Sequence, residues 1–235
     1  MFKKTAQLAK KYFSEFVLIF ISVLLAFVLT EWSSNQGKKV SQEKILLEIS
    51  NGLLIDKTDA QGNEEAHRLG IKSCKFWRNV VMGKNINNDS VALNYFYLTR
   101  TLISVQNVTA YETLKSKGLE IVENDSLRKQ IIHLYEIDYQ IMQKFEEDYH
   151  ENQFFDNYFI EINKIIAPNL RFDTVGNIVG INSPLILKDA EKNILLSYLW
   201  KIEFTRNERA AASKQLAGKI DKLQNQIATL LKKGN

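Results

Sequence analysis

The 235-residue chain has little that would bend or cross-link it: one cysteine, two prolines and ten glycines. Because Cys74 is the only cysteine, no internal disulfide can form, and the fold must be stabilised by its core alone. The scarcity of proline and glycine leaves long stretches without helix breakers, which favours long helices. A content of 45% hydrophobic and 25% charged residues is that of a globular chain and excludes intrinsic disorder.

Most of the chain also lacks any cluster of charges of one sign. The net charge is only +4, and Lys3, Lys4, Lys10 and Lys11 near the N-terminus account for that balance. The remainder is close to neutral and has no basic face. The sequence therefore predicts no nucleic-acid partner.

Catalytic motifs are missing as well. No serine lies in a Gly-x-Ser-x-Gly context, and the glycine pair Gly176 and Gly180 lacks the lysine of a phosphate-binding loop. Cys74 lies beside Phe76 and Trp77 in an apolar stretch, which favours a buried, inert thiol over a nucleophile. The sequence predicts that the protein is not an enzyme and has no catalytic or cofactor-binding residue.

What the sequence does contain is one long hydrophobic run, Phe16 to Leu29, in which Ser22 is the only polar residue. Extended to Tyr12 and Trp32, it covers the ~30 Å hydrocarbon core at ~1.5 Å per residue. Aromatic rings then lie at both interfaces. We predict a tail at residues 1–11, a transmembrane helix at 12–32, and a helical domain at 33–235.

A cleaved signal peptide and a buried core helix are the alternatives to this anchor. The run is not followed by a small-x-small cleavage site, which disfavours the signal peptide. Lys10 and Lys11 abut the run, which a core helix would not require. Glu15 lies at the start of the span, where it is either a solvated interfacial carboxylate or a functional one that pairs with another helix or relays protons.

The lysines around the run predict its orientation. Lys3, Lys4, Lys10 and Lys11 precede it, and three lysines follow it within the counted window: Lys38, Lys39 and Lys44. The positive-inside bias favours a cytoplasmic N-terminus. We therefore expect a single-pass protein whose domain lies outside the cytoplasm.

Apolar residues at helical spacing predict an all-α domain after a polar neck at residues 33–39. The expected helices cover 40–82, exposed or interrupted near Gly62, and 91–105. A capping-box pattern at Thr109 opens a third helix, which stops at Gly118. A fourth runs from the caps at residues 124–126 to about 166, and residues 168–183 form a loop or small hairpin.

The last expected helix begins with Ser183-Pro184 or Asp189 as its cap and continues to Lys233. Its final third carries a 4-3 hydrophobic seam, made of Leu216, Ile220, Leu223, Ile227 and Leu230. The antiparallel partner in reach is the helix that leaves the membrane, residues 40–56. The same seam could instead pair between protomers, so the sequence predicts an elongated bundle with coiled-coil-like helices and leaves the oligomeric state open.

A resemblance to a known family rests on residues 111–136, YETLKSKGLEIVENDSLRKQIIHLYE, and on the Glu-led span from Glu15 to Trp32. These resemble an uncharacterised bacterial family of single-span membrane proteins with a domain of unknown function. Leu29-Thr30-Glu31 departs from the Gln/Asn-rich run that usually precedes the tryptophan of that family. The resemblance implies an inner-membrane anchor and a helical domain, and it implies no activity.

Two Glu-x-x-His pairs, Glu64/His67 and Glu147/His150, have the spacing of half of a carboxylate-bridged di-metal site. The missing glutamates could be found among Glu112, Glu203 and Glu208. Both pairs lie in strongly polar stretches, however, which indicates solvated faces. The sequence therefore predicts no metal site.

Two aromatic groups, residues 95–97 and residues 154–159, indicate core packing or a partner groove. Two functional classes fit these observations. The first is a membrane-anchored interaction or structural protein, either an oligomer or an accessory subunit of an envelope complex, with the lipid bilayer and other helices as partners. The second is an extracytoplasmic, sensor-like ligand-binding bundle.

Overall fold

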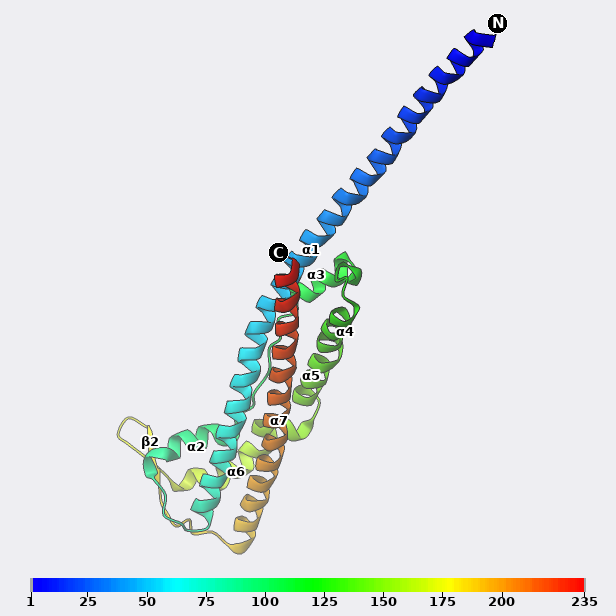
Figure 1. Cartoon of the computed structure of the whole chain (residues 1–235). Coiled ribbons are helices and arrows are strands. Elements are labelled where there is room, and N and C mark those ends of the chain that lie inside the picture. Colours follow the sequence, from blue (N-terminus) through cyan, green and yellow to red (C-terminus); the bar gives the residue numbers. More distant parts are fainter. Residues whose placement is uncertain (1, 235) are drawn as a thin grey trace.

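A computed structural model describes the backbone of residues 2–234 and the side chains of residue 13 and residues 16–232. It is organised by two long helices, α1 (Phe2–Val81) and α7 (Asp189–Gly234). Figure 1 shows α7 running antiparallel to the second half of α1, so that the C-terminal end of α7 lies where α1 leaves the domain. The predicted all-α class, with an elongated bundle of long helices, is confirmed.

Heptad-spaced side chains hold α1 and α7 together. In α7 the buried residues follow a 4-3 spacing over most of the helix: Leu195, Leu199, Ile202, Arg206, Arg209, Ser213, Leu216, Ile220, Leu223 and Ile227. In α1 the matching buried series is Leu46, Ile49, Leu53, Asp56, Ala60, Asn63, His67, Gly70, Cys74, Trp77 and Val81. We call these two series the inner seams. The predicted seam at residues 216–230 therefore pairs within the chain.

Helix α1 is continuous at two places where the sequence predicted a neck or an interruption. Residues 33–39 are helical and form no separate neck, and Gly62 does not interrupt the helix. The polar stretch from Asp56 to Arg68 is not wholly exposed, because Asp56, Asn63 and His67 are buried against the bundle. The expectation of an exposed or broken centre was wrong because these polar residues have partners on other elements.

The second predicted helix is too long. Helix α2 covers Val91–Leu98, and residues 99–108 form neither helix nor strand. We call residues 99–108 the strap, because it runs along α1 from α2 to α3 (Thr109–Lys117). The strap forms because side chains of α1, α5 and α7 bond its backbone groups, which replaces the hydrogen bonds of a helix.

The short helix α3 begins at Thr109 with Val108 as its cap, so Thr109 is not the capping residue that the sequence predicted. It ends at Gly118, whose φ of 104° favours glycine, as predicted. Helix α4 (Asp125–His133) is capped by the predicted Asn124, whose side chain accepts a bond from the Leu127 N–H at 2.9 Å.

The predicted single helix to residue 166 is broken once and so divided into two parts. Helix α4 continues through a π-helical turn, Leu134–Asp138, into α5 (Tyr139–Glu147). Helix α6 (Ile160–Ile166) follows a second π-helical turn, Phe155–Phe159. The break lies at residues 148–153, where the Gln153 side chain donates to the Glu146 carbonyl at 2.6 Å and ends α5.

The predicted small hairpin is present. Strands β1 (Leu170–Phe172) and β2 (Ile178–Ile181) pair antiparallel, with Leu170 opposite Ile181. Helix α7 begins only at Asp189, and Ser183-Pro184 lies outside it. The start is set by Glu191, whose carboxylate accepts a bond from the Lys188 N–H at 2.9 Å, which makes Lys188 the cap.

Two apolar clusters form the core. The first lies between the proximal part of α1, the end of α7, and α3 to α5, and includes Leu46, Ile49, Ile220 and Ile227. The second lies at the far end of the bundle around Trp77, Phe154, Ile162, Leu195 and Leu199. The N-terminal part of α1 projects away from both clusters (Figure 1).

Candidate functional site

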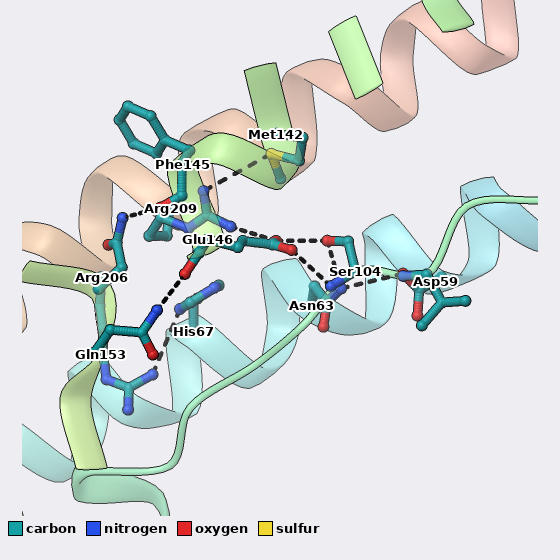
Figure 2. Close-up of polar contacts among 12 residues, drawn as sticks. Asp59, Asn63, His67, Ser104, Met142, Phe145, Glu146, Gln153, Arg206 and Arg209 are labelled. Atoms are coloured by element: carbon teal, nitrogen blue, oxygen red, sulfur yellow. Dashed lines mark hydrogen bonds and ion pairs between the residues drawn. The ribbon is translucent and has the colours of Figure 1, made fainter. Parts of the chain in front are cut away.

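A layer of buried polar and charged side chains separates the two apolar clusters (Figure 2). It is built by α1, the strap, α5 and α7. The inner seams place Asp56, Asn63 and His67 of α1 and Arg206 and Arg209 of α7 at positions that carry apolar residues elsewhere in the same heptads. Such a layer is costly to bury unless each group has partners.

Arg209 and Glu146 form a buried ion pair between α7 and α5 (Figure 2). The two side chains are only 1% and 4% exposed. Arg209 also lies over the Phe145 ring, with its Cζ 5.3 Å from the ring centroid. Burial lowers the pKa of Arg209, and the charge of Glu146 opposes that shift.

Glu146 also fastens the strap. Its carboxylate accepts the Ser104 N–H at 2.7 Å and the Ser104 hydroxyl at 2.6 Å. Ser104 Oγ in turn accepts a bond from the Asn63 amide of α1 at 3.1 Å. One carboxylate therefore joins α5, α7 and the strap, and through Ser104 it also reaches α1.

Two aspartates of α1 bond the strap further along. Asp56 accepts the Asn107 N–H at 2.7 Å and the Tyr139 hydroxyl at 2.6 Å. Asp59 accepts the Val105 N–H at 3.2 Å. Burial raises the pKa of Asp56, and its two hydrogen bonds oppose the shift. Carboxylates thus supply the partners that a neighbouring β-strand would supply to an extended segment.

Arg206 is fully buried and has no carboxylate partner among the described side chains. Its Nη2 donates to the carbonyls of Tyr97, Leu98 and Arg100, at the C-terminal end of α2, at 2.9–3.2 Å. The negative end of the α2 dipole favours a cation there. The guanidinium also stacks on Phe154, 4.2 Å from the ring centroid, and burial lowers its pKa to about 10.

His67 faces this guanidinium, with its Nδ1 3.4 Å from Arg206 Nη1. Burial, followed by the charges of Arg206 and Arg209, lowers the pKa of His67 to about 3, so the ring is neutral at pH 7. The expectation that the Glu64/His67 pair lies on a solvated face was wrong for His67, which is 2% exposed. Glu64 forms an ion pair with Arg68 at 2.7 Å.

The other pair, Glu147/His150, is exposed as predicted. Among the side chains that the structure describes, no group of three or more His, Cys, Asp or Glu residues is arranged to hold a metal ion. The absence of a metal site stays a prediction. The neighbourhood of His67 would in addition repel a cation, because Arg206 lies beside it.

Cys74 is fully buried beside Trp77 in the distal cluster, as the sequence predicted. Burial raises the pKa of the Cys74 thiol to about 12, so it is protonated at neutral pH. The two aromatic groups that the sequence singled out contain both buried and exposed rings. Phe154 and Tyr158 are buried, whereas Phe96 and Phe155 are about half exposed, at 52% and 51%.

Surface grooves line the side of the domain formed by α4 and α7. One has a volume of about 620 Å³ and is lined mainly by polar residues, including Gln130, Asp221 and Gln226. A second groove of about 460 Å³ adjoins it and includes Lys129, His133 and Lys222. Sequence analysis did not single out these residues, because they have no motif spacing.

The buried arginines were also missed, although the sequence contains a signal for them. Extending the 4-3 spacing of residues 216–230 towards the N-terminus places Ser213, Arg209 and Arg206 in the seam, followed by Ile202 and Leu199. Charged residues at seam positions between apolar heptads indicate a buried polar layer.

The apolar run near the N-terminus is the other candidate site. From Phe16 to Trp32 its side chains are exposed almost without exception, and none of its apolar window is buried within the described protein. This run is the one described helix segment that is long and apolar enough to cross a membrane. Glu15, which the sequence leaves open between a solvated interfacial carboxylate and a functional one, lies outside the described side chains.

Comparison with protein families, curated proteins and solved structures gives no match to this chain. The resemblance of residues 111–136 to a bacterial membrane family therefore stays a prediction.

Proposed function

We propose that this protein is a single-pass membrane protein, with residues 12–32 in the bilayer and the helical domain outside the cytoplasm. The observation that carries the proposal is the change in burial along α1. From Ile45 onward one face of the helix is buried, whereas the apolar residues from Phe16 to Leu29 are exposed around the whole circumference. A helix that is apolar all round requires an apolar environment, and a bilayer supplies it.

For its role we propose an interaction or structural protein, either an oligomer or an accessory subunit of a larger envelope assembly. The polar layer supports this role, because its charged groups bind one another and the strap and are shut off from solvent. It connects the elements of the domain and does not open to a substrate. Exposed apolar side chains outside the span, such as Leu47, Leu54 and Val105, favour contact with another protein.

The groove between α4 and α7 supports the second candidate function, an extracytoplasmic ligand-binding module. Its volume of about 620 Å³ lies within the range of small-molecule sites. Purification of the full chain in mild detergent distinguishes the two functions. A co-purifying membrane protein or a homo-oligomer supports the first, and a monodisperse chain with a bound small molecule detected by native mass spectrometry supports the second.

The membrane topology has its own test. We place the protein in the inner membrane of a bacterium, following the resemblance of residues 111–136, with its N-terminus in the cytoplasm. Alkaline extraction should leave it in the membrane pellet. A cysteine introduced by Asn235→Cys should react with an impermeant maleimide from outside intact spheroplasts, while buried Cys74 serves as the unlabelled background. Labelling only after lysis would overturn the orientation, and a mature N-terminus near Ser33 would overturn the anchor.

A further inference from the structure

The side of α1 that faces away from α7 carries a second heptad series, which we call the outer seam. Its members follow a 4-3 spacing without interruption: Val23, Ala26, Thr30, Ser33, Gly37, Val40, Lys44, Leu47, Asn51, Leu54 and Thr58. Every one of them is exposed. At ~100° per residue, Leu47 of the outer seam and Ile49 of the inner seam lie on opposite faces of the helix.

The half of the outer seam within the domain keeps the heptad spacing of a coiled coil, with apolar residues at the d positions and polar residues at the a positions. Val40, Leu47 and Leu54 occupy the d positions and are 64%, 54% and 58% exposed. Lys44, Asn51 and Thr58 occupy the a positions, where a lysine or asparagine fixes the register and oligomeric state of a coiled coil at a cost in stability. Exposed leucines at this spacing are not explained by the fold of one chain.

The other half of the outer seam lies within the predicted span and just after it. There the same 4-3 spacing falls on small residues: Ala26, Thr30, Ser33 and Gly37. Small residues let two membrane helices approach closely. The Thr30 hydroxyl donates to the Ala26 carbonyl at 2.8 Å, so it needs no partner on another helix. A Cβ added at Gly37 would meet no atom within 4 Å, which leaves this position open to a neighbouring helix.

We propose that the outer seam of α1 pairs in parallel with the outer seam of a second copy of this chain, from the bilayer to Thr58. The proposal rests on the membrane anchoring proposed above and names the partner. Both halves of the seam belong to one 4-3 series on one unbroken helix, and a left-handed supercoil keeps such a series facing one partner. A partner that covers both halves must itself be a helix that continues from the bilayer into the domain. A second copy of this chain, inserted in the same direction, has such a helix and places each residue of the seam beside the same residue of its partner.

Charge complementarity supports the self-pairing. Lys44 lies in the seam, and the acidic residues Glu43 and Glu48 flank it on either side. In a parallel pair, a lysine at a lies beside the g residue that precedes it on the other helix, so each Lys44 meets Glu43 of the second copy. The two Asn51 amides lie opposite each other, where they can bond across the axis.

The surroundings of α1 limit the pairing to this region. The inner seam of α7 is buried against α1 and is not available to another chain. Beyond Thr58 the same 4-3 spacing reaches Gln61, Glu65, Arg68, Lys72 and Lys75, which are exposed and polar or charged. The proposed contact therefore ends where the outer seam loses its apolar residues.

Cysteine cross-linking of the full chain in native membranes tests the pairing. Leu47→Cys and Leu54→Cys place thiols at d positions, and Ala228→Cys places one on the exposed side of α7. Cys74 is fully buried and serves as a silent background. We expect about tenfold more disulfide-linked dimer after oxidation for the two seam variants than for Ala228→Cys, because only the seam brings two thiols within bonding distance.

The variant Leu47→Lys/Leu54→Lys provides a second readout that does not depend on oxidation. Both leucines are exposed, so the domain stays folded with unchanged circular dichroism. The mass in detergent should fall from twice that of the chain to that of one chain, whereas the α7 control Ala228→Lys should remain dimeric.

The outcomes separate this proposal from the membrane anchoring. A chain that stays in the membrane pellet but is monomeric, or that cross-links equally at Ala228→Cys, overturns the pairing alone. Cross-links from the seam to a protein of another mass also overturn it and identify a different partner. A chain that is absent from the membrane pellet overturns the anchoring and the pairing together.

Discussion

The guanidinium of Arg206 lies across the backbone of α1 at Gly70, so close that a Cβ at Gly70 would be 2.4 Å from Arg206 Nε. Glycine at this position lets a fully buried arginine pass between α1 and Phe154 and reach the carbonyl groups at the end of α2.

Gly70→Ala should destabilise the protein by about 1–3 kcal/mol, because the added methyl group displaces a buried side chain that cannot move without losing its bonds. Gly62→Ala is the matched control on the same helix, since nothing lies within 4 Å of its added Cβ. The control should stabilise the protein by about 0.5–1 kcal/mol through helix propensity. Urea unfolding of both variants in detergent measures the difference, and a stabilising Gly70→Ala would contradict the crossing.

Glu146→Gln should cost about 3–5 kcal/mol, because it leaves the buried charge of Arg209 without its counter-charge. The exposed pair Lys201–Glu151 is the control, and Glu151→Gln should cost only about 0–1 kcal/mol. Adding Arg209→Met to Glu146→Gln should recover much of the loss, since no buried charge then lacks a partner. Additive losses in the double variant would show that the two residues do not act as a pair.

Acid should destabilise the protein through His67. The folded-state pKa of His67 is lowered to about 3 from 6.5, so the unfolded chain binds a proton first as the pH falls. The stability contributed by the neutral ring is complete above pH 6.5 and is lost between pH 6.5 and pH 3. Between pH 6.5 and 4.5 the loss is about 2–3 kcal/mol.

His67→Gln isolates this effect, because it removes the titration without adding a charge. The pH dependence of its unfolding free energy should be flatter than that of the wild type over pH 4.5–6.5. Asp56 works in the opposite direction, since burial raises its pKa and its contribution is lost as the pH rises. An unchanged slope in His67→Gln would mean that another group controls acid stability.

Ile220→Asp/Ile227→Asp should unfold the domain or lower its stability by more than about 4 kcal/mol, because both side chains are fully buried in the inner seam. Lys222→Asp/Ala228→Asp introduces the same side chains at exposed positions of the same turns of α7 and should stay within about 1 kcal/mol of the wild type. Thermal unfolding followed by circular dichroism compares the two. Equal melting temperatures would contradict the antiparallel packing of α1 and α7.

Much of the fold follows from local sequence pattern. Scarce glycine and proline, the 4-3 spacing of residues 216–230, the cap at Asn124 and the glycine at position 118 predicted helices and boundaries that the structure confirms. The extra length predicted for α2 was wrong because side chains distant in sequence, such as Glu146 and Arg206, supply partners for the backbone of the strap. The unbroken helix to residue 166 was wrong for a local reason, since the Gln153 side chain bonds the Glu146 carbonyl and ends α5.

The sequence by itself determined the apolar run, the all-helical class and the 4-3 seam at residues 216–230, because these depend only on the spacing of residues along one chain. Only the tertiary structure decided which face of α1 is buried, since that depends on what α7 brings to α1. It also decided that His67 is buried and neutral while His150 is exposed, although both lie in the same Glu-x-x-His pattern. The burial and pKa of a polar residue depend on its neighbours in space. Arg206, which lies beside His67 and helps to lower its pKa, is far from it in the sequence.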